Sequence, residues 1–140
     1  MRIMCLDVGK VRIGIAQSDP MKIIASPLEV LKRTQSINND AKYVANLIKA
    51  NEVELLVVGL PLKLDGSAGE SAIMAQEFAE KIAKFSDVKI EFQDERLSTV
   101  SAERILLEGN VRRDKRKGVV DKIAATIILQ NYLDRLAYKK

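Results

Sequence analysis

Residues 1–17, MRIMCLDVGKVRIGIAQ, contain two apolar runs joined by a short Gly-Lys-Val link. In the first run, the alternation of side chains along an extended chain places Ile3, Cys5 and Asp7 on one face of a strand. The second run, residues 12–17, resumes the apolar pattern after the glycine-containing link. These runs therefore predict two neighbouring strands with a tight connection.

A third extended segment follows this pair. The tripeptide Ser18-Asp19-Pro20 carries strong turn chemistry, and residues 21–25 predict another short strand. Together the three segments predict an antiparallel meander at the start of the chain.

Helical and extended patterns alternate in the rest of the chain. The run ELLVVGL at residues 54–60 is typical of a strand that is buried on both faces. Other patterns predict a helix from Ser36 to Ala50 with Ser36 as its cap, a helix at 72–82, a strand at 88–93, a helix capped by Ser98 or Thr99 that continues to Leu107, and a last helix from about Val119 to Leu136. Since parallel strands require crossovers, which are normally helical, this order predicts an α/β fold with a mixed sheet.

The composition limits the class of protein. At 140 residues the chain fits one domain, and no apolar run approaches the roughly 18 to 20 residues needed to cross a bilayer. The opening residues predict a strand and not a signal peptide, so we expect a cytoplasmic protein without a membrane partner.

The chemistry available to the chain is limited too. A single cysteine cannot form an internal disulfide, and the absence of histidine excludes Ser-His and Cys-His catalytic pairs and most zinc sites. Catalysis would have to use carboxylates, lysines, hydroxyls or bound metals. The net charge of +4 favours polyanionic partners, although a solvated basic surface explains it equally well.

Acidic residues at strand ends could form a catalytic or metal site at one edge of the predicted sheet. Asp7 ends the first strand, and Asp94 and Glu95 end the last one, so their carboxylates meet if these strands are parallel. Asp121 lies near the start of the final helix, one turn before two alanines that let this helix approach the sheet. The inner stripe of that helix is predicted to contain Val120, Ile123, Ala124, Ile127, Ile128 and Asn131.

Each acidic position also has a purely structural interpretation. Asp7 could cap the turn that follows its strand. Asp94 and Glu95 could pair with a neighbouring arginine or cap the next helix, and strand alternation leaves open which of the two points inward. Asp121 could serve only to complement the helix dipole.

As a set, the acidic positions suit one or two Mg²⁺ or Mn²⁺ ions, which prefer carboxylate and water ligands. Two such ions about 3.5–4 Å apart can activate water and stabilise the leaving oxygen in phosphodiester cleavage. The stretch GNVRRDKRKG at residues 109–118 is predicted to be a loop, and its basic side chains, directly before Asp121, could hold a phosphate backbone. Sparse aromatic residues argue against base stacking.

Motifs in a fixed order extend over nearly the whole chain. They are DVGKVRIGIA at 7–16, GLPLKLDGS at 59–67, DERLST at 94–99 and KGVVDKIAA at 117–125. In this combination the chain resembles the YqgF/RuvX family of RuvC-like proteins, which are proposed Holliday junction resolvases or pre-16S rRNA nucleases. The resemblance implies a ribonuclease H-like fold, with a mixed five-stranded sheet flanked by helices, and metal-dependent endonuclease activity.

The resemblance also implies roles for individual residues. Asp7, Glu95 and Asp121 match the acidic set, which would bind metal and catalyse. With the basic segment added, the expected substrate-binding residues are Lys10, Arg12, Arg96, Ser98, Thr99, Arg112, Arg113, Arg116 and Lys117, and the supporting turn and loop residues are Gly9, Gly14, Gly59, Pro61, Asp65 and Gly66. RuvC has an acidic residue where Gly59-Leu60-Pro61 stands here, so Glu95 would replace it from the next strand.

The leading hypothesis is a metal-dependent endonuclease that cuts structured RNA during 5′-end maturation of pre-16S ribosomal RNA, as a monomer or homodimer, with ribosomal precursor particles as partners. A four-way DNA junction is the alternative substrate, and a non-catalytic nucleic-acid-binding module is the alternative class. DVGKVRIG also resembles the phosphate hairpin of actin-like ATPases and sugar kinases, but those need two such domains around a nucleotide.

Overall fold

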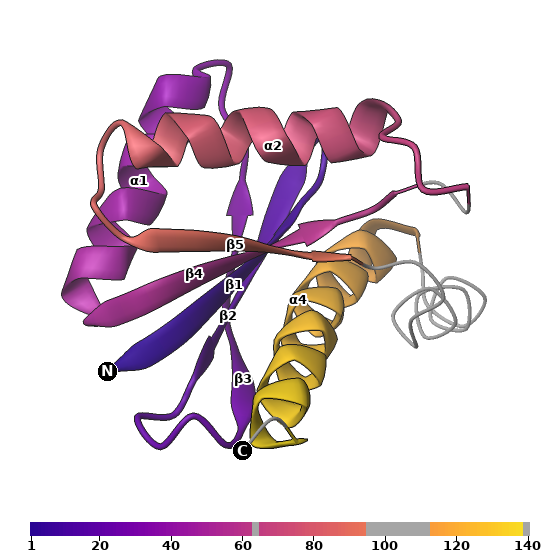
Figure 1. Cartoon of the computed structure of the whole chain (residues 1–140). Coiled ribbons are helices and arrows are strands. Elements are labelled where there is room, and N and C mark those ends of the chain that lie inside the picture. The colour runs from indigo at the N-terminus through magenta and orange to yellow at the C-terminus, as the bar shows by residue number, and fades with distance from the viewer. Residues whose placement is uncertain (63–64, 95–112, 139–140) are drawn as a thin grey trace.

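The computed structural model describes residues 1–62, 65–94 and 113–138, and in the last range it describes side chains from residue 123 to residue 137. The elements, shown in Figure 1, are β1 (Arg2–Val8), β2 (Arg12–Ser18), β3 (Ala25–Lys32), α1 (Ile37–Ala50), β4 (Val53–Leu60), α2 (Glu70–Ala83), β5 (Lys89–Asp94) and α4 (Arg113–Tyr138). None of the helices in these ranges combines the length and apolarity needed to span a membrane.

The strands form one mixed five-stranded sheet in the order β3-β2-β1-β4-β5. β1 and β2 are antiparallel, as are β2 and β3, whereas β4 is parallel to both β1 and β5. This confirms the predicted meander and the α/β class. The carboxyl ends of β1, β4 and β5 consequently meet at one edge of the sheet, which is where ligands bind in open α/β sheets.

Helices cover both faces of the sheet: α1 and α2 lie on one side and α4 on the other (Figure 1). Alternation along β1 directs Met4, Leu6 and Val8 towards α1 and α2, and Ile3 and Cys5 towards α4. Burial of each large apolar side chain in these two cores contributes about 1.5–3 kcal/mol to folding. The face that β1 presents to α4 is also the face of Asp7.

The third strand begins later than predicted. β3 starts at Ala25, and the residues before it form a turn in which Oδ1 of Asp19 accepts hydrogen bonds from the N–H groups of Ile23 at 2.8 Å and Ile24 at 2.9 Å. An aspartate that binds nearby main-chain N–H groups competes with strand pairing. The apolar residues of this segment therefore line a turn instead of a strand.

The last helix begins earlier than predicted. α4 starts at Arg113, so the basic stretch is helical from that residue onward, in agreement with the high helix propensity of arginine and lysine. The buried stripe of α4 is rotated from the predicted one: Ile123, Ile127 and Asn131 are only half-buried. The buried residues are Ala124, Ala125, Ile128, Leu129, Tyr132 and Leu133.

The other predicted elements are confirmed. The hydroxyl of Ser36 caps α1 by accepting a hydrogen bond from the N–H of Asn39 at 3.1 Å. α2 buries all the apolar residues on which its prediction rested, namely Ala72, Ala75, Phe78, Ala79 and Ile82. The predicted helix that ends at Leu107 lies outside the described residues.

Candidate active site

Asp7 lies near the carboxyl end of β1, on the side of the sheet that α4 covers. The residue is only 8% exposed. In the pair of β1 with β2, Asp7 is directly opposite Gly14. Burial of a carboxylate is costly unless hydrogen bonds or a cation compensate for the lost water, so this position suits a ligand-binding acid.

Glycines flank Asp7 on both neighbouring strands. Leu6 is level with Val58 in the parallel pair of β1 with β4, so Gly59, the next residue of β4, is level with Asp7. Gly59 in turn pairs with Gln93 of β5. The row across the sheet is therefore Gly14, Asp7, Gly59 and Gln93. No side chain from either adjacent strand competes for the space beside the carboxylate.

Side chains of α4 bind the polar groups of β5. Arg135 donates a hydrogen bond to the side-chain oxygen of Gln93, and the phenol of Tyr132 donates one to Glu91. Burial, together with the hydrogen bond to Glu91, raises the pKa of Tyr132 to about 12. The β5 end of the row is thus occupied by polar groups that already have partners.

A tight turn follows Asp7 and connects β1 to β2. The N–H of Gly9 donates to the carbonyl oxygen of Arg12 at 2.9 Å. A Cβ atom at position 9 would lie 2.7 Å from that same oxygen, which is closer than real Cβ contacts allow. The turn therefore requires glycine at position 9 for steric reasons.

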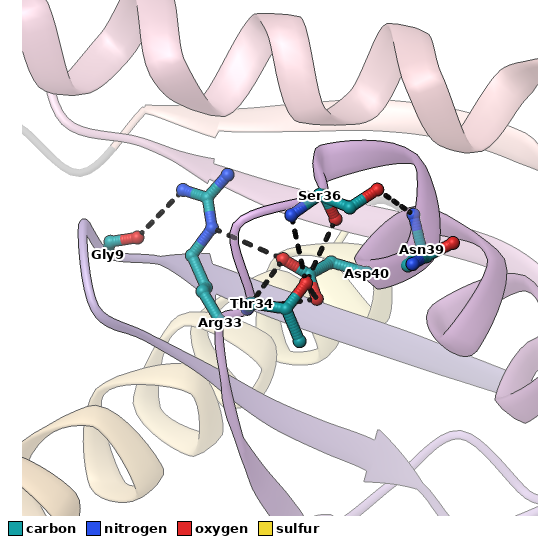
Figure 2. Close-up of polar contacts among 6 residues, drawn as sticks. All are labelled: Gly9, Arg33, Thr34, Ser36, Asn39 and Asp40. Atoms are coloured by element: carbon teal, nitrogen blue, oxygen red, sulfur yellow. Dashed lines mark hydrogen bonds and ion pairs between the residues drawn. The ribbon is translucent and has the colours of Figure 1, made fainter.

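A polar cluster around the buried carboxylate of Asp40 holds this turn from the side of α1 (Figure 2). Nη1 of Arg33 donates to the carbonyl oxygen of Gly9 at 3.1 Å, while Nε lies 4.0 Å from Oδ2 of Asp40. Asp40 also accepts hydrogen bonds from the hydroxyl of Thr34 at 2.9 Å and from its N–H at 3.1 Å. The guanidinium of Arg33 lies 5.3 Å from the ring centroid of Phe78.

Sequence reasoning did not identify Arg33 or Asp40 as site residues. An acidic residue in the first turn after the Ser36 cap was the available signal for Asp40. Nothing local could have revealed the contact between Arg33 and Gly9, because 24 positions separate the two residues in the sequence.

The β2–β3 side of the row carries basic residues. Arg12 is directly opposite Lys32, and Arg12 shares the α4 side of the sheet with Gly14 and therefore with Asp7. Arg12 is half-buried and Lys32 is exposed. Lys10, on the turn after β1, forms an exposed ion pair with Glu70 of α2 at 3.0 Å.

The loop after β4 approaches α2 through a small turn. Oδ1 of Asp65 accepts hydrogen bonds from the N–H of Ser67 at 2.8 Å and from its hydroxyl at 2.6 Å. Gly66, between them, has a φ of 91°, a conformation that favours glycine. Pro61 is half-buried at the end of β4. Of the predicted supporting residues, Asp65 and Gly66 thus lie in this turn.

The structure describes only part of the predicted site. Asp94 ends β5 on the side opposite Asp7, because its neighbour Gln93 contacts α4. Among the residues that the structure describes, no group of three acidic, histidine or cysteine side chains could hold a metal ion. Outside the described residues lie Glu95, Arg96, Ser98, Thr99 and Arg112, and outside the described side chains lie those of Arg113, Arg116, Lys117 and Asp121.

Known proteins resemble the chain over almost its full length. Residues 1–135 match the family RuvX, Holliday junction resolvase. A "Putative pre-16S rRNA nuclease" of Syntrophomonas wolfei is 47% identical over 134 residues, covering 96% of this chain and 94% of the relative. A protein of the same name from Clostridium perfringens is 46% identical over 137 residues, covering 98% and 99%.

Solved structures share the fold. RuvC of T. thermophilus in complex with a Holliday junction substrate superposes with a TM-score of 0.60 at 13% sequence identity, covering 97% of this chain and 96% of RuvC. Thermus thermophilus RuvC in another structure superposes with a TM-score of 0.58 at 12% identity, covering 98% and 97%. The ribonuclease H-like fold expected from the sequence is thereby confirmed.

Proposed function

Since this chain belongs to the RuvX family, we propose that it is a divalent-metal-dependent endonuclease that cuts structured RNA in the 5′-end processing of pre-16S ribosomal RNA. The observation that carries the proposal is the buried carboxylate of Asp7, which lies between two glycines at the carboxyl edge of the sheet. The names of the relatives supply the substrate. Precursor ribosomal particles are the corresponding partners.

Asp7, Glu95 and Asp121 form the proposed acidic set. Gln93 of β5 lies on the same side of the sheet as Asp7, and Glu95 follows it by two positions in the sequence. Position 121 lies one helical turn before Ala124 and Ala125, which share the buried α4 core with Cys5 of β1. These relationships support a set that converges at Asp7.

Carboxylate oxygens are the ligands that Mg²⁺ and Mn²⁺ prefer, so the donor set fits either ion. When bound, one or two such ions supply an activated water and stabilise the leaving oxygen of a phosphodiester. The contribution of the chain is to hold Asp7 in a buried row where no neighbouring strand crowds the carboxylate. The Gly9 turn and the Asp65 turn are proposed to support the conformation of the main chain at that edge of the sheet.

Basic residues are proposed to bind the substrate backbone. α4 begins at Arg113, so Arg113, Arg116 and Lys117 stand at positions i, i+3 and i+4 of its sequence. With Lys10, Arg12 and Arg112 they supply positive charge next to the acidic set. Arg96, Ser98 and Thr99 are proposed to contact the substrate from the second carboxylate motif.

The test compares Asp7→Asn with the wild type on a precursor ribosomal RNA fragment and on a four-way DNA junction, in Mg²⁺ and in Mn²⁺. We expect the wild type to cut the RNA and Asp7→Asn to be inactive, since the substitution removes charge at nearly constant volume. Asp87→Asn, an exposed carboxylate in the connection before β5, is the matched control and should stay active. Retained activity in Asp7→Asn would contradict the assignment.

Four-way DNA is the second candidate substrate, because the matching family is described as Holliday junction resolvase. A homodimer would suit the symmetry of a junction, whereas RNA processing is compatible with a monomer. Cleavage of the junction alone would favour this alternative. RNA binding that does not depend on metal, with no cleavage of either substrate, would favour a non-catalytic binding module.

A further inference from the structure

We propose that the RNA backbone leaves the active site across the ends of β2 and β3, where Arg12 and Lys32 bind one phosphate group together, and that it does not leave across β5. This inference rests on the proposed function, since it adds a substrate path to the same site. Arg12 was an expected substrate-binding residue, whereas Lys32 is a new assignment.

The register of the sheet places both cations beside Asp7. Asp7 is opposite Gly14, and Arg12 lies two residues before Gly14 on the same side of β2. Arg12 is directly opposite Lys32, which ends β3. Because β2 is antiparallel to β1, the start of β2 lies at the same edge as the carboxyl end of β1. A phosphate next to the cleaved bond would therefore meet this pair.

The pairing of two cations requires a physical explanation. Side chains directly opposite each other in an antiparallel pair have Cβ atoms about 4.5–5.5 Å apart, and like charges there are destabilising. Within the described part of the chain neither Arg12 nor Lys32 has an ion-pair partner, whereas Lys10 pairs with Glu70. An anion between the two side chains would remove the repulsion, and a phosphodiester oxygen is such an anion.

The opposite end of the row is unsuited to a phosphate. The carboxylate of Glu91 lies on the α4 side of β5, where it accepts the hydrogen bond of Tyr132 and forms an ion pair with Lys89 at 3.5 Å. Gln93 is buried and engaged by Arg135. Among the described residues, a backbone that crossed β5 would meet charged and polar side chains that already bind one another, while a backbone that crosses β2 and β3 meets two cations without an ion-pair partner.

The experiment measures binding of a precursor ribosomal RNA fragment without divalent metal over a range of KCl concentrations. Each of Arg12→Gln and Lys32→Gln should weaken binding by about fivefold and reduce the slope of log affinity against log salt by about 0.7 to 0.9. The double variant should lose less than the product of the single effects, because the two side chains share one phosphate. Lys89→Gln, at the start of the β5 edge strand where Lys89 pairs with Glu91, is the control for loss of a lysine outside the proposed path and should change neither quantity.

The proposed path is overturned if Lys32→Gln leaves the slope of log affinity against log salt unchanged. It is also overturned if Lys89→Gln weakens RNA binding as much as Lys32→Gln does. Weakened binding of a four-way DNA junction with unchanged RNA binding overturns the choice of RNA as its occupant. If the wild type cuts RNA and Lys32→Gln binds RNA normally, the proposed path is wrong but the proposed nuclease activity is supported. If the variants bind RNA more weakly as expected but the wild type cuts neither substrate, the path is supported and the proposed nuclease activity is wrong. Circular dichroism melts of the variants check that each remains folded.

Discussion

The guanidinium of Arg33 donates a hydrogen bond to the carbonyl oxygen of Gly9 at a distance of 3.1 Å. Gly9 directly follows β1 and is two residues from Asp7, so this bond fixes the main chain beside the proposed metal ligand. Arg33 is in turn fixed by Asp40 and by the ring of Phe78. The turn is thereby held from the side of α1 and α2, while Asp7 is on the side of α4.

Arg33→Gln should lower the cleavage rate more than the affinity for RNA, because the turn next to Asp7 loses its anchor while the basic surface keeps Arg12 and Lys32. The free energy of unfolding should also fall by about 1–3 kcal/mol, since the buried carboxylate of Asp40 loses its neighbouring cation. Urea unfolding and single-turnover cleavage at saturating metal measure the two effects, and Arg33→Lys should restore part of the rate.

Lys84→Gln at the exposed end of α2 is the control for loss of a positive charge. If Arg33→Gln loses stability but keeps the wild-type rate and metal dependence, the cluster serves folding alone.

Gly9→Ala tests the turn from the other direction. The added methyl group would lie 2.7 Å from the carbonyl oxygen of Arg12, so the turn must open, and we expect a loss of about 1–3 kcal/mol in unfolding free energy. Cleavage should decrease as well because Asp7 is two residues away. Val11→Ala, at a 48% exposed position of the same turn, should be nearly neutral in thermal melts and activity. Equal effects of the two substitutions would show that the turn tolerates a Cβ at position 9.

The predictable parts of the fold are those that a local pattern determines. β1 and β4 follow from alternation and from an apolar run, and both strands contribute buried residues to the two cores. The apolar pattern places β3 too early, because the side chain of Asp19 binds main-chain N–H groups four and five residues away and converts an apolar segment into a turn. The pattern places the start of α4 too late, because a run of basic residues is typical of a loop although arginine and lysine also form helices readily.

The place of Asp7 in the fold was predictable in a similar way. The position of Asp7 at a strand end follows from the sequence, and the row of glycines around it agrees with the motifs that suggested the family. The partners of Arg33 and the pairing of Arg12 with Lys32 were not predictable, because they depend on strand register and helix packing between distant segments. Glu95 and the side chain of Asp121 remain predictions.

Asp19→Asn should reduce stability in a pH-dependent way. The N–H groups of Ile24 and Ile23 bind the carboxylate and hold the pKa of Asp19 below its ordinary value of 3.8. A lowered folded-state pKa stabilises the protein above that ordinary value, and the contribution is lost as the pH falls through the folded-state pKa. In urea unfolding, the wild type should therefore have a larger free energy of unfolding than Asp19→Asn at neutral pH, and this difference should disappear at acidic pH. A difference in unfolding free energy between the wild type and Asp19→Asn that stays the same at both pH values would refute the assignment.

Tyr132→Phe should destabilise the packing of α4 on β5, because Glu91 loses the hydroxyl that donates to it; the expected loss at neutral pH is about 1 kcal/mol in unfolding free energy. Burial and this hydrogen bond raise the pKa of Tyr132 to about 12, so the phenol stabilises the fold below its ordinary value of 10.0 and the contribution is lost as the pH rises through about 12. Absorbance titration of the folded protein should show a late-ionising phenol that Tyr132→Phe lacks. Tyr43→Phe provides the comparison, because the hydrogen bond to Glu29 raises the pKa of Tyr43 as well. That substitution should remove a different phenol from the absorbance titration. If Tyr132→Phe removes only a phenol that titrates at the ordinary pH, Tyr132 does not bind Glu91 in solution.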